Sequence, residues 1–292
     1  MPNRPAVLAG SWYPGEAEEL AAALDACLRQ AERLYGSARP EGEPAAAVLP
    51  HAGLAYSGAV AAAVFNWLRR AGTEVETFVV FGACHRVNPG IPAIWARGAW
   101  ETPLGSVRVD EKLADILIEA GVGRADERPH AGDNAIELQI PFIRRLFPEA
   151  GLVPVAMPFR PDAHRLGGLA AAAAGRRVIA LASTDLTHYG AAFGLMPAGV
   201  GESALAWTRD NDRRFLEKLL EMDLAAIVPT AERDHSACGA GAAAAAAGWA
   251  GFRGCRAGRL LARTDSHEAA PGGRADHIVG YAALAYAVKA EV

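Results

Sequence analysis

The sequence has few cysteines and no long apolar run, and both shortages narrow what the protein can be. Its four cysteines form no C-x-x-C pair and no disulfide pattern, so we expect free thiols in a reducing compartment. The Ala-rich apolar stretches are too short or too often interrupted to cross a bilayer, and the first residues hold no run long enough for a signal peptide. These features predict a soluble, cytoplasmic protein without a membrane partner.

An excess of positive charge is also missing. The chain has 29 Lys and Arg against 33 Asp and Glu, a formal net charge of -4. Nucleic acid is therefore not expected as a partner. The sequence contains no P-loop, G-x-G-x-x-G or G-x-S-x-G motif, so nucleotide hydrolysis and the α/β-hydrolase fold lack support.

What the sequence does contain is an alternation of short apolar runs and amphipathic segments. The apolar runs are rich in Val, Ile or Ala and are bounded by Gly, Pro or charge, which is typical of buried strands. They predict strands at 45–50, 77–84, 152–157, 177–184, 255–264 and 278–287. The amphipathic segments predict helices at 18–34, 57–70, 111–120, 135–147, 162–174, 202–222 and 239–247.

This alternation predicts the α/β class, with a central, mostly parallel or mixed sheet flanked by helices. At 292 residues and 51% hydrophobic content the chain can bury a large core, and we expect one domain over residues 1–292. The linker-like stretch 36–44 is too short and too early to divide two domains. A second loose stretch, 190–201, is predicted to be a functional loop.

Three predicted strands run into histidines at their carboxyl ends: His51, His85 and His188. The carboxyl ends of strands line the ligand crevice of an open α/β sheet, so these imidazoles can converge on one point. One histidine after a strand is more often structural, but three at the same topological position favour a metal site. The remaining histidines other than His130 are interpreted as surface residues or as supports of the site; they are His164, His235, His267 and His277.

Cys238 is the cysteine whose context differs most from that of a core residue. It precedes a Gly-rich predicted helix start, where the helix dipole stabilises a thiolate that can bind a metal or attack a substrate. Cys84, beside His85, is the competing thiol and is expected to be packed. Asp185 lies three residues before His188, and a carboxylate near an imidazole can fix its tautomer and raise its basicity.

A set of short motifs follows along the chain in a fixed order. They are AGSWYPG at 9–15, PHAGLAYSG at 50–58, GACHR at 82–86, TPLGSVRVD at 102–110, AIELQIPF at 135–142, STDLTHYG at 183–190, ACGAGA at 237–242 and VGYAALA at 279–285. Together they resemble the Memo-like family, the protein B type of the AmmeMemoRadiSam system. The fold of that family is related to the class III extradiol ring-cleavage (LigB-like) dioxygenases. The resemblance runs nearly end to end.

The resemblance implies a metal bound by His51, His85 and Cys238. It also implies that His188 lines the same pocket, with Asp185 as an accompanying carboxylate.

One position departs from the family pattern. The family often reads Glu-His-Ser-x-Glu where this chain has Asp-Asn-Ala-Ile-Glu, so Asn134 replaces the expected pocket histidine. Asn134 can hydrogen-bond a substrate but cannot transfer protons near neutral pH. His130 is a second candidate for substrate binding if its segment is irregular, and is otherwise a loop histidine.

The implied function is that of a metal-dependent oxidoreductase of the dioxygenase type, acting on a small oxygen-bearing substrate such as a catechol. In those enzymes two histidines and a carboxylate hold Fe(II) with open positions. A cysteine thiolate in place of the carboxylate has the same charge but is softer. The metals we expect are therefore Fe(II) first, with copper or zinc as alternatives. His188 would act as acid and base, with Asp185 orienting it.

Two other functions stay open. Animal members of the family are described as adaptors in receptor signalling, which would make the pocket vestigial. A cysteine-nucleophile hydrolase using Cys238 and His188 is the third candidate. Among microbial members the resemblance implies a functional link to a radical-SAM protein. The sequence is compatible with a monomer and with a homo-oligomer.

Overall fold

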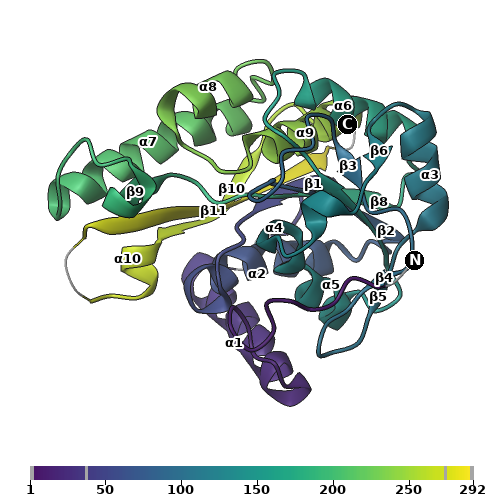
Figure 1. Cartoon of the computed structure of the whole chain (residues 1–292), viewed down its shortest axis with the longest axis horizontal. Coiled ribbons are helices and arrows are strands. Elements are labelled where there is room, and N and C mark those ends of the chain that lie inside the picture. The colour runs from purple at the N-terminus through teal and green to yellow at the C-terminus, as the bar shows by residue number, and fades with distance from the viewer. Residues whose placement is uncertain (1–2, 37–38, 273–274, 290–292) are drawn as a thin grey trace.

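A mixed sheet of nine strands crosses the centre of the molecule in the computed structural model, which describes residues 3–36, 39–272 and 275–289 (Figure 1). The strand order is β10-β11-β1-β8-β2-β7-β3-β6, and β9 pairs with β11. The strands are β1 (Glu43–Leu49), β2 (Thr77–Gly82), β3 (Ala93–Ile94), β6 (Arg124–Ala125), β7 (Gly151–Ala156), β8 (Val178–Ser183), β9 (His188–Gly190), β10 (Arg259–Asp265) and β11 (His277–Val288).

The four central strands, β1, β8, β2 and β7, are parallel to one another. Their register sets Leu49, Ser183 and Gly82 side by side at the carboxyl ends of β1, β8 and β2. The residues that follow these three strands therefore emerge at one place on the sheet edge. β11 and β10 add to the sheet in antiparallel fashion, so the sheet is mixed.

Helices cover both faces of the sheet (Figure 1). One apolar core joins the sheet to α1 (Ala17–Tyr35), α2 (Leu54–Ala71) and α5 (Ile140–Leu146). The other joins it to α3 (Glu111–Glu119), α6 (Ala163–Ala173), α7 (Glu202–Leu220), α8 (Ile227–Asp234) and α9 (Ala240–Phe252). The remaining elements are β4 (Ala99–Trp100), β5 (Val107–Arg108), α4 (Asn134–Glu137), α10 (Ser266–Ala269) and the 3-10 turns η1 (Arg128–His130) and η2 (Ala191–Phe193).

The Ala-rich helix α9 packs unusually close to α6. A Cβ added to Gly167 would overlap the carbonyl oxygen of Ala245, and one added to Gly248 would overlap that of His164. Glycine at these two contacts lets the helix backbones touch. The close contact fixes α9, and with it the segment just before α9, against the sheet.

The single α/β domain with a mixed central sheet confirms the predicted fold class. Each predicted strand is present, although β10 begins four residues later than the sequence suggested. The helix predicted at 135–147 is divided into α4 and α5, because Pro141 has no N–H to donate to the carbonyl of Glu137. Neither α8 nor the short strands were predicted.

The two stretches expected to be loose are 36–44 and 190–201. Part of 36–44 lies outside the described residues. The stretch 190–201 is largely irregular, with only η2 inside it. In the ranges that the structure describes, no helix has the length and hydropathy to span a membrane.

Candidate metal centre

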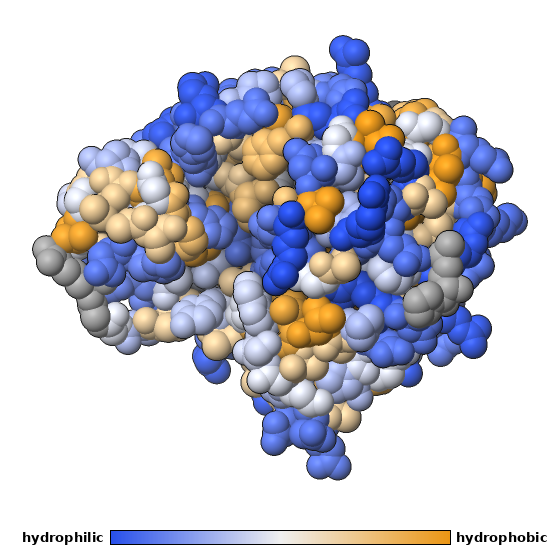
Figure 2. Space-filling view, in the orientation of Figure 1, coloured by the Kyte–Doolittle hydropathy of each residue, from blue (hydrophilic) through white to orange (hydrophobic). Residues whose placement is uncertain are grey.

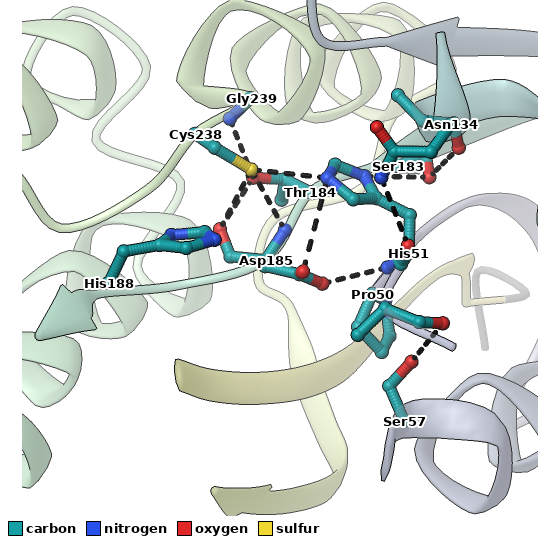
Figure 3. A network of polar contacts seen from close by, with 12 residues as sticks. Pro50, His51, Ser57, Asn134, Ser183, Thr184, Asp185, His188, Cys238 and Gly239 are labelled. Atoms are coloured by element: carbon teal, nitrogen blue, oxygen red, sulfur yellow. Dashed lines mark hydrogen bonds and ion pairs between the residues drawn. The ribbon is translucent and has the colours of Figure 1, made fainter. Parts of the chain in front are cut away.

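The three predicted metal ligands meet at the carboxyl edge of the sheet. His51 follows β1, His85 follows β2 and Cys238 precedes α9. One donor atom from each residue lies within 4.8 Å of the other two. Figure 3 shows the thiol of Cys238 facing the ring of His51 across the end of β8. Residues 187 positions apart in the sequence thus share one centre.

His51 is held in the tautomer that a metal ligand needs. Its Nδ1 lies 3.2 Å from the hydroxyl of Ser183. That hydroxyl donates its one proton to the carbonyl of Ala135 and also accepts a hydrogen bond from Gln139, so toward His51 it must accept. His51 therefore carries its proton on Nδ1. The lone pair on Nε2 faces the sulfur of Cys238 at 3.2 Å.

Asp133 does the same for His85. Its Oδ1 lies 3.1 Å from Nδ1 of His85, and its Oδ2 accepts the backbone N–H of His85 at 2.8 Å. The same carboxylate caps α4 by accepting from Ala135. A carboxylate on Nδ1 leaves Nε2 of His85 for the centre, and carboxylate–imidazole pairs of this kind support metal-binding histidines.

The thiol of Cys238 is shifted toward its thiolate form. Its sulfur accepts the backbone N–H of Asp185 at 3.3 Å. Burial alone would raise the pKa of Cys238, but His51 and His85 outweigh it and hold that pKa well below its usual range. Conversely, burial lowers the pKa of His85, but Asp133 and Cys238 outweigh it and raise it to about 10. The group is thus a thiolate facing imidazoles.

The other cysteines contrast with Cys238. Burial raises the pKa of Cys27 and of Cys255 to about 11, and that of Cys84 to about 12. These thiols stay protonated at neutral pH. Cys84, the competing candidate, is not part of the ligand group found among the described residues.

Asp185 contacts the backbone of His51 and lies near its ring. Its Oδ1 accepts the backbone N–H of His51 at 2.7 Å, and its Oδ2 lies 4.0 Å from Nε2 of the same residue. The sequence suggested that this carboxylate orients His188. The structure gives that task to Leu186, whose carbonyl lies 3.1 Å from Nδ1 of His188. The reason is geometric, because Asp185 is turned toward the end of β1.

His188 stands at the wall of a cavity beside the centre. Because its Nδ1 meets a carbonyl, which only accepts, that nitrogen carries the proton and Nε2 keeps the lone pair. The ring points toward the side of Asp185 and Cys238 (Figure 3). His188 and Cys238 both line a cavity of about 530 Å³. A small molecule in this cavity would touch both side chains.

The two predicted substrate-binding residues are placed differently. Asn134 lies at the start of α4, and its side-chain amide donates to the carbonyl of His51 at 3.3 Å. The ring of His130 is directed elsewhere, because Nε2 lies 3.0 Å from the carbonyl of Ala93 and the ring packs edge-on against Trp95 and Trp100. Burial lowers the pKa of His130 to about 4, so it is neutral. Substrate binding by Asn134 stays a prediction, and this packing does not favour it for His130.

The donor set fits a metal ion. Metal–nitrogen bonds of about 2.0 Å and metal–sulfur bonds of about 2.3 Å place two donors on one ion roughly 3–4 Å apart. The observed group needs only small side-chain movements to reach that spacing. A thiolate and two neutral imidazoles, each with its Nδ1 tied to an oxygen, are the states in which these side chains bind metals.

Comparison with known proteins agrees with the order of the motifs. The model of the family described as Memo-like protein matches residues 4–285. The chain belongs to the Memo family. It is 33% identical over 296 residues to a MEMO1 family protein of Pyrococcus abyssi (strain GE5 / Orsay), which covers 97% of this chain and 99% of the relative. A MEMO1 family protein of Methanopyrus kandleri is 32% identical over 299 residues, covering 98% of this chain and 99% of the relative.

Several residues that hydrogen-bond the site residues of this Memo family member were not predicted from the sequence. Asp133 stood in the motif that was compared with the family, yet no role was assigned to it. A carboxylate directly before the position of the missing histidine was the available signal. Ser183 and Gln139 had no signal, because their contacts depend on how β8 and the start of α5 lie against β1.

Proposed function

We propose that this Memo family member is a metal-dependent oxidoreductase of the class III extradiol dioxygenase type. The metal is Fe(II), held by His51, His85 and Cys238, and the substrate is a small oxygen-bearing molecule such as a catechol. The observation that supports this most directly is the meeting of three metal-binding donors beside a cavity that His188 also lines. The reducing cytoplasm, where thiolates persist, is the compartment we assign to it.

A metal held by His51, His85 and Cys238 would supply open coordination positions for oxygen and for substrate oxygens. The thiolate of Cys238 contributes the single negative charge that a carboxylate ligand contributes in the dioxygenases. The backbone N–H of Asp185 donates to the sulfur and stabilises this charge. Asp133 and Ser183 hold the two imidazoles so that both present Nε2 to the centre.

The proton of the substrate hydroxyl is taken by His188. Its Nε2 bears the lone pair, because the hydrogen bond from Nδ1 to the carbonyl of Leu186 keeps the proton on Nδ1. Asn134 stands where the family often has a second histidine, and an amide cannot exchange protons near neutral pH. Proton transfer in this chain therefore rests on His188, with Asn134 as a hydrogen-bond donor.

The test separates metal binding from turnover. Metal content is measured after purification without chelators, and oxygen uptake is then measured with a panel of catechols. We expect about one metal per chain and uptake that His188→Ala abolishes while the metal stays bound. The control is His267→Ala, in α10, which should change neither. Full uptake in metal-loaded His188→Ala would remove His188 from the mechanism.

A cysteine-nucleophile hydrolase is the second candidate, favoured by the 3.2 Å separation of the Cys238 sulfur and His51 Nε2. A thiolate beside an imidazole is an activated nucleophile. This candidate requires hydrolysis of an ester panel by metal-free protein and its loss on thiol alkylation. Metal-free protein that folds normally and shows neither activity would favour the adaptor. The link to a radical-SAM protein stays a prediction.

A further inference from the structure

The cavity beside the metal centre is uneven in charge. Its apolar wall consists of Phe159, Phe193, Leu195, Ala231 and Ala237. Among the described residues that line it, the one carboxylate is Glu232, and no Lys or Arg is present. Glu232 is exposed near the carboxyl end of α8, beside His235. A ligand in the cavity therefore meets a negative charge at this end.

The arginines near Glu232 are engaged elsewhere. Arg233 makes two hydrogen bonds of 2.8 Å to the carboxylate of Asp234. Arg214 also reaches Asp234, at 3.2 Å. Within residues 3–36, 39–272 and 275–289, no cation lies within ion-pair distance of Glu232. Its carboxylate is left for a ligand.

The aromatic part of the wall is fixed in place. Phe193 is 41% exposed, and its ring lies between two imidazoles, with centroid distances of 4.9 Å to His188 and 4.5 Å to His277. The turn that carries it is closed by backbone hydrogen bonds in both directions between Gly190 and Leu195. Phe159, 40% exposed, also lines the cavity. Exposed rings on the wall favour flat, ring-shaped ligands.

Figure 2 shows that this face of the molecule is hollowed beside the lobe that carries β9 and α7 in Figure 1. Cys238 and Glu232 line one cavity, so a ring held near Cys238 leaves room for a substituent to extend toward the exposed end of α8.

We propose that the substrate is a planar ring compound with a basic substituent, whose ring packs against Phe193 and whose cation meets Glu232. Rings that carry a carboxylate instead are disfavoured. This rests on the function proposed above for the placement of the ring next to the metal centre. The selectivity itself is a property of binding and needs no turnover.

The test measures binding to the full chain saturated with Zn(II), so that no redox step takes place. Calorimetry compares three probes that share a ring diol: dopamine, ethylcatechol and dihydroxyphenylpropionate. Dopamine should bind about 3–5-fold more tightly than ethylcatechol, the range expected for one solvent-exposed ion pair. Dihydroxyphenylpropionate should bind most weakly.

Two variants assign the effect. Glu232→Gln should remove the advantage of dopamine and leave the Kd of ethylcatechol unchanged, whereas the control Glu119→Gln, on the exposed side of α3, should leave all three unchanged. Phe193→Leu should weaken all three probes by a similar factor, because the ring contact is common to them. Both substituted residues are exposed, so folding is not at risk.

Several results would overturn the proposal. These are equal binding of dopamine and ethylcatechol, failure of all three probes to bind, or a dopamine advantage that survives Glu232→Gln. Tightest binding of dihydroxyphenylpropionate would also overturn it and would direct attention to Arg86, exposed beside His85. Oxygen uptake is measured separately, so selective binding without uptake would reject the proposed activity and keep the selectivity.

Discussion

Two polar groups in this protein, the Arg4–Glu137 pair and the candidate metal centre, differ in burial and in how their polar atoms are partnered. Arg4 and Glu137 form an ion pair of 2.6 Å at 2% and 1% side-chain exposure. The other oxygen of Glu137 accepts from the hydroxyl of Tyr13 at 2.7 Å and from the N–H of Leu8 at 2.8 Å. Further N–H groups of Arg4 donate to backbone carbonyls, and its guanidinium lies over Trp100. The charges of this group are therefore paired with each other, and their remaining polar atoms are hydrogen-bonded within the protein.

The candidate metal centre is only partly buried, because His51 is buried, Cys238 is half-buried and His85 is exposed. The imidazoles of His51 and His85 face the sulfur of Cys238, while their Nδ1 atoms are held by Ser183 and Asp133. Burial lowers the pKa of both imidazoles, but the nearby thiolate of Cys238 and the carboxylates of Asp185 and Asp133 raise it. A buried group whose polar atoms are all paired contributes to folding, whereas a partly exposed group of thiol and imidazole side chains with perturbed pKa values is typical of a functional site.

The comparison makes opposite predictions for the two groups, and the largest effect concerns Glu137. Glu137→Gln leaves the buried guanidinium of Arg4 without its counter-charge, which should lower the free energy of unfolding by about 3–5 kcal/mol. Urea unfolding measures this. The metal content of the folded fraction should not change.

The matched control is Glu119→Gln on the exposed side of α3, which should stay within about 0.5 kcal/mol of the parent protein. A loss below about 1 kcal/mol in Glu137→Gln would show that the ion pair is not a folding element. The stabilising role assigned to the Arg4–Glu137 pair would then be wrong.

Cys238→Ser should reverse the pattern. It removes one of the proposed metal ligands. Loss of a residue that only supports a ligand lowers metal affinity by up to about 100-fold, so loss of the ligand itself should lower it further. Stability of the metal-free protein should change by less than about 1 kcal/mol, since the thiol is not a core group. Metal titration and urea unfolding measure the two effects.

Cys255→Ser serves as the contrasting variant, because Cys255 is 4% exposed in the apolar core. It should keep the metal and lose stability. Full metal binding by Cys238→Ser would exclude the thiolate as a ligand.

Asp133→Asn should have an intermediate effect on the centre. It weakens the hold on Nδ1 of His85, and we expect about a 10–100-fold loss of metal affinity. Because Asp133 also caps α4, the control is Asp110→Asn, which makes the same change at the cap of α3 and should leave metal affinity unchanged. Equal metal affinities of the two variants would assign Asp133 to helix capping alone.

The smallest effect is a difference in thiol reactivity. In metal-free protein the pKa of Cys238 is lowered, so its thiolate is present at about pH 7 and should react first with iodoacetamide. Cys27, Cys84 and Cys255, with pKa values raised to about 11 or 12, should react only as the pH is raised. Added metal should protect Cys238. Mass spectrometry of labelled peptides reads the order, and labelling of Cys238 last would contradict it.

Much of the fold, and the three residues that meet in the candidate metal centre, could be predicted from the sequence. The apolar runs were long enough to mark the central strands, and parallel strands place His51 and His85 at the same edge. Cys238 lies far along the chain; its Gly-rich helix start suggested a reactive thiol, and the resemblance to the Memo-like family grouped it with His51 and His85. The family relationship was confirmed over nearly the whole chain.

The partners of these residues could not be predicted. Glu137 pairs with Arg4 across 133 positions, and no local pattern links them. The choice of Leu186 over Asp185 as the partner of His188 depends on the turn between β8 and β9. The cavity wall combines η2, α8 and the segment after β7, so Phe193, Glu232 and Phe159 carried no common signal.

The most direct test of the metal centre is an anomalous-scattering map from crystals of protein purified without chelators, recorded at the iron and copper edges. We predict one peak at the iron edge, within bonding distance of Nε2 of His51, Nε2 of His85 and Sγ of Cys238. A metal peak elsewhere in the chain, with these three donors unliganded, would contradict it.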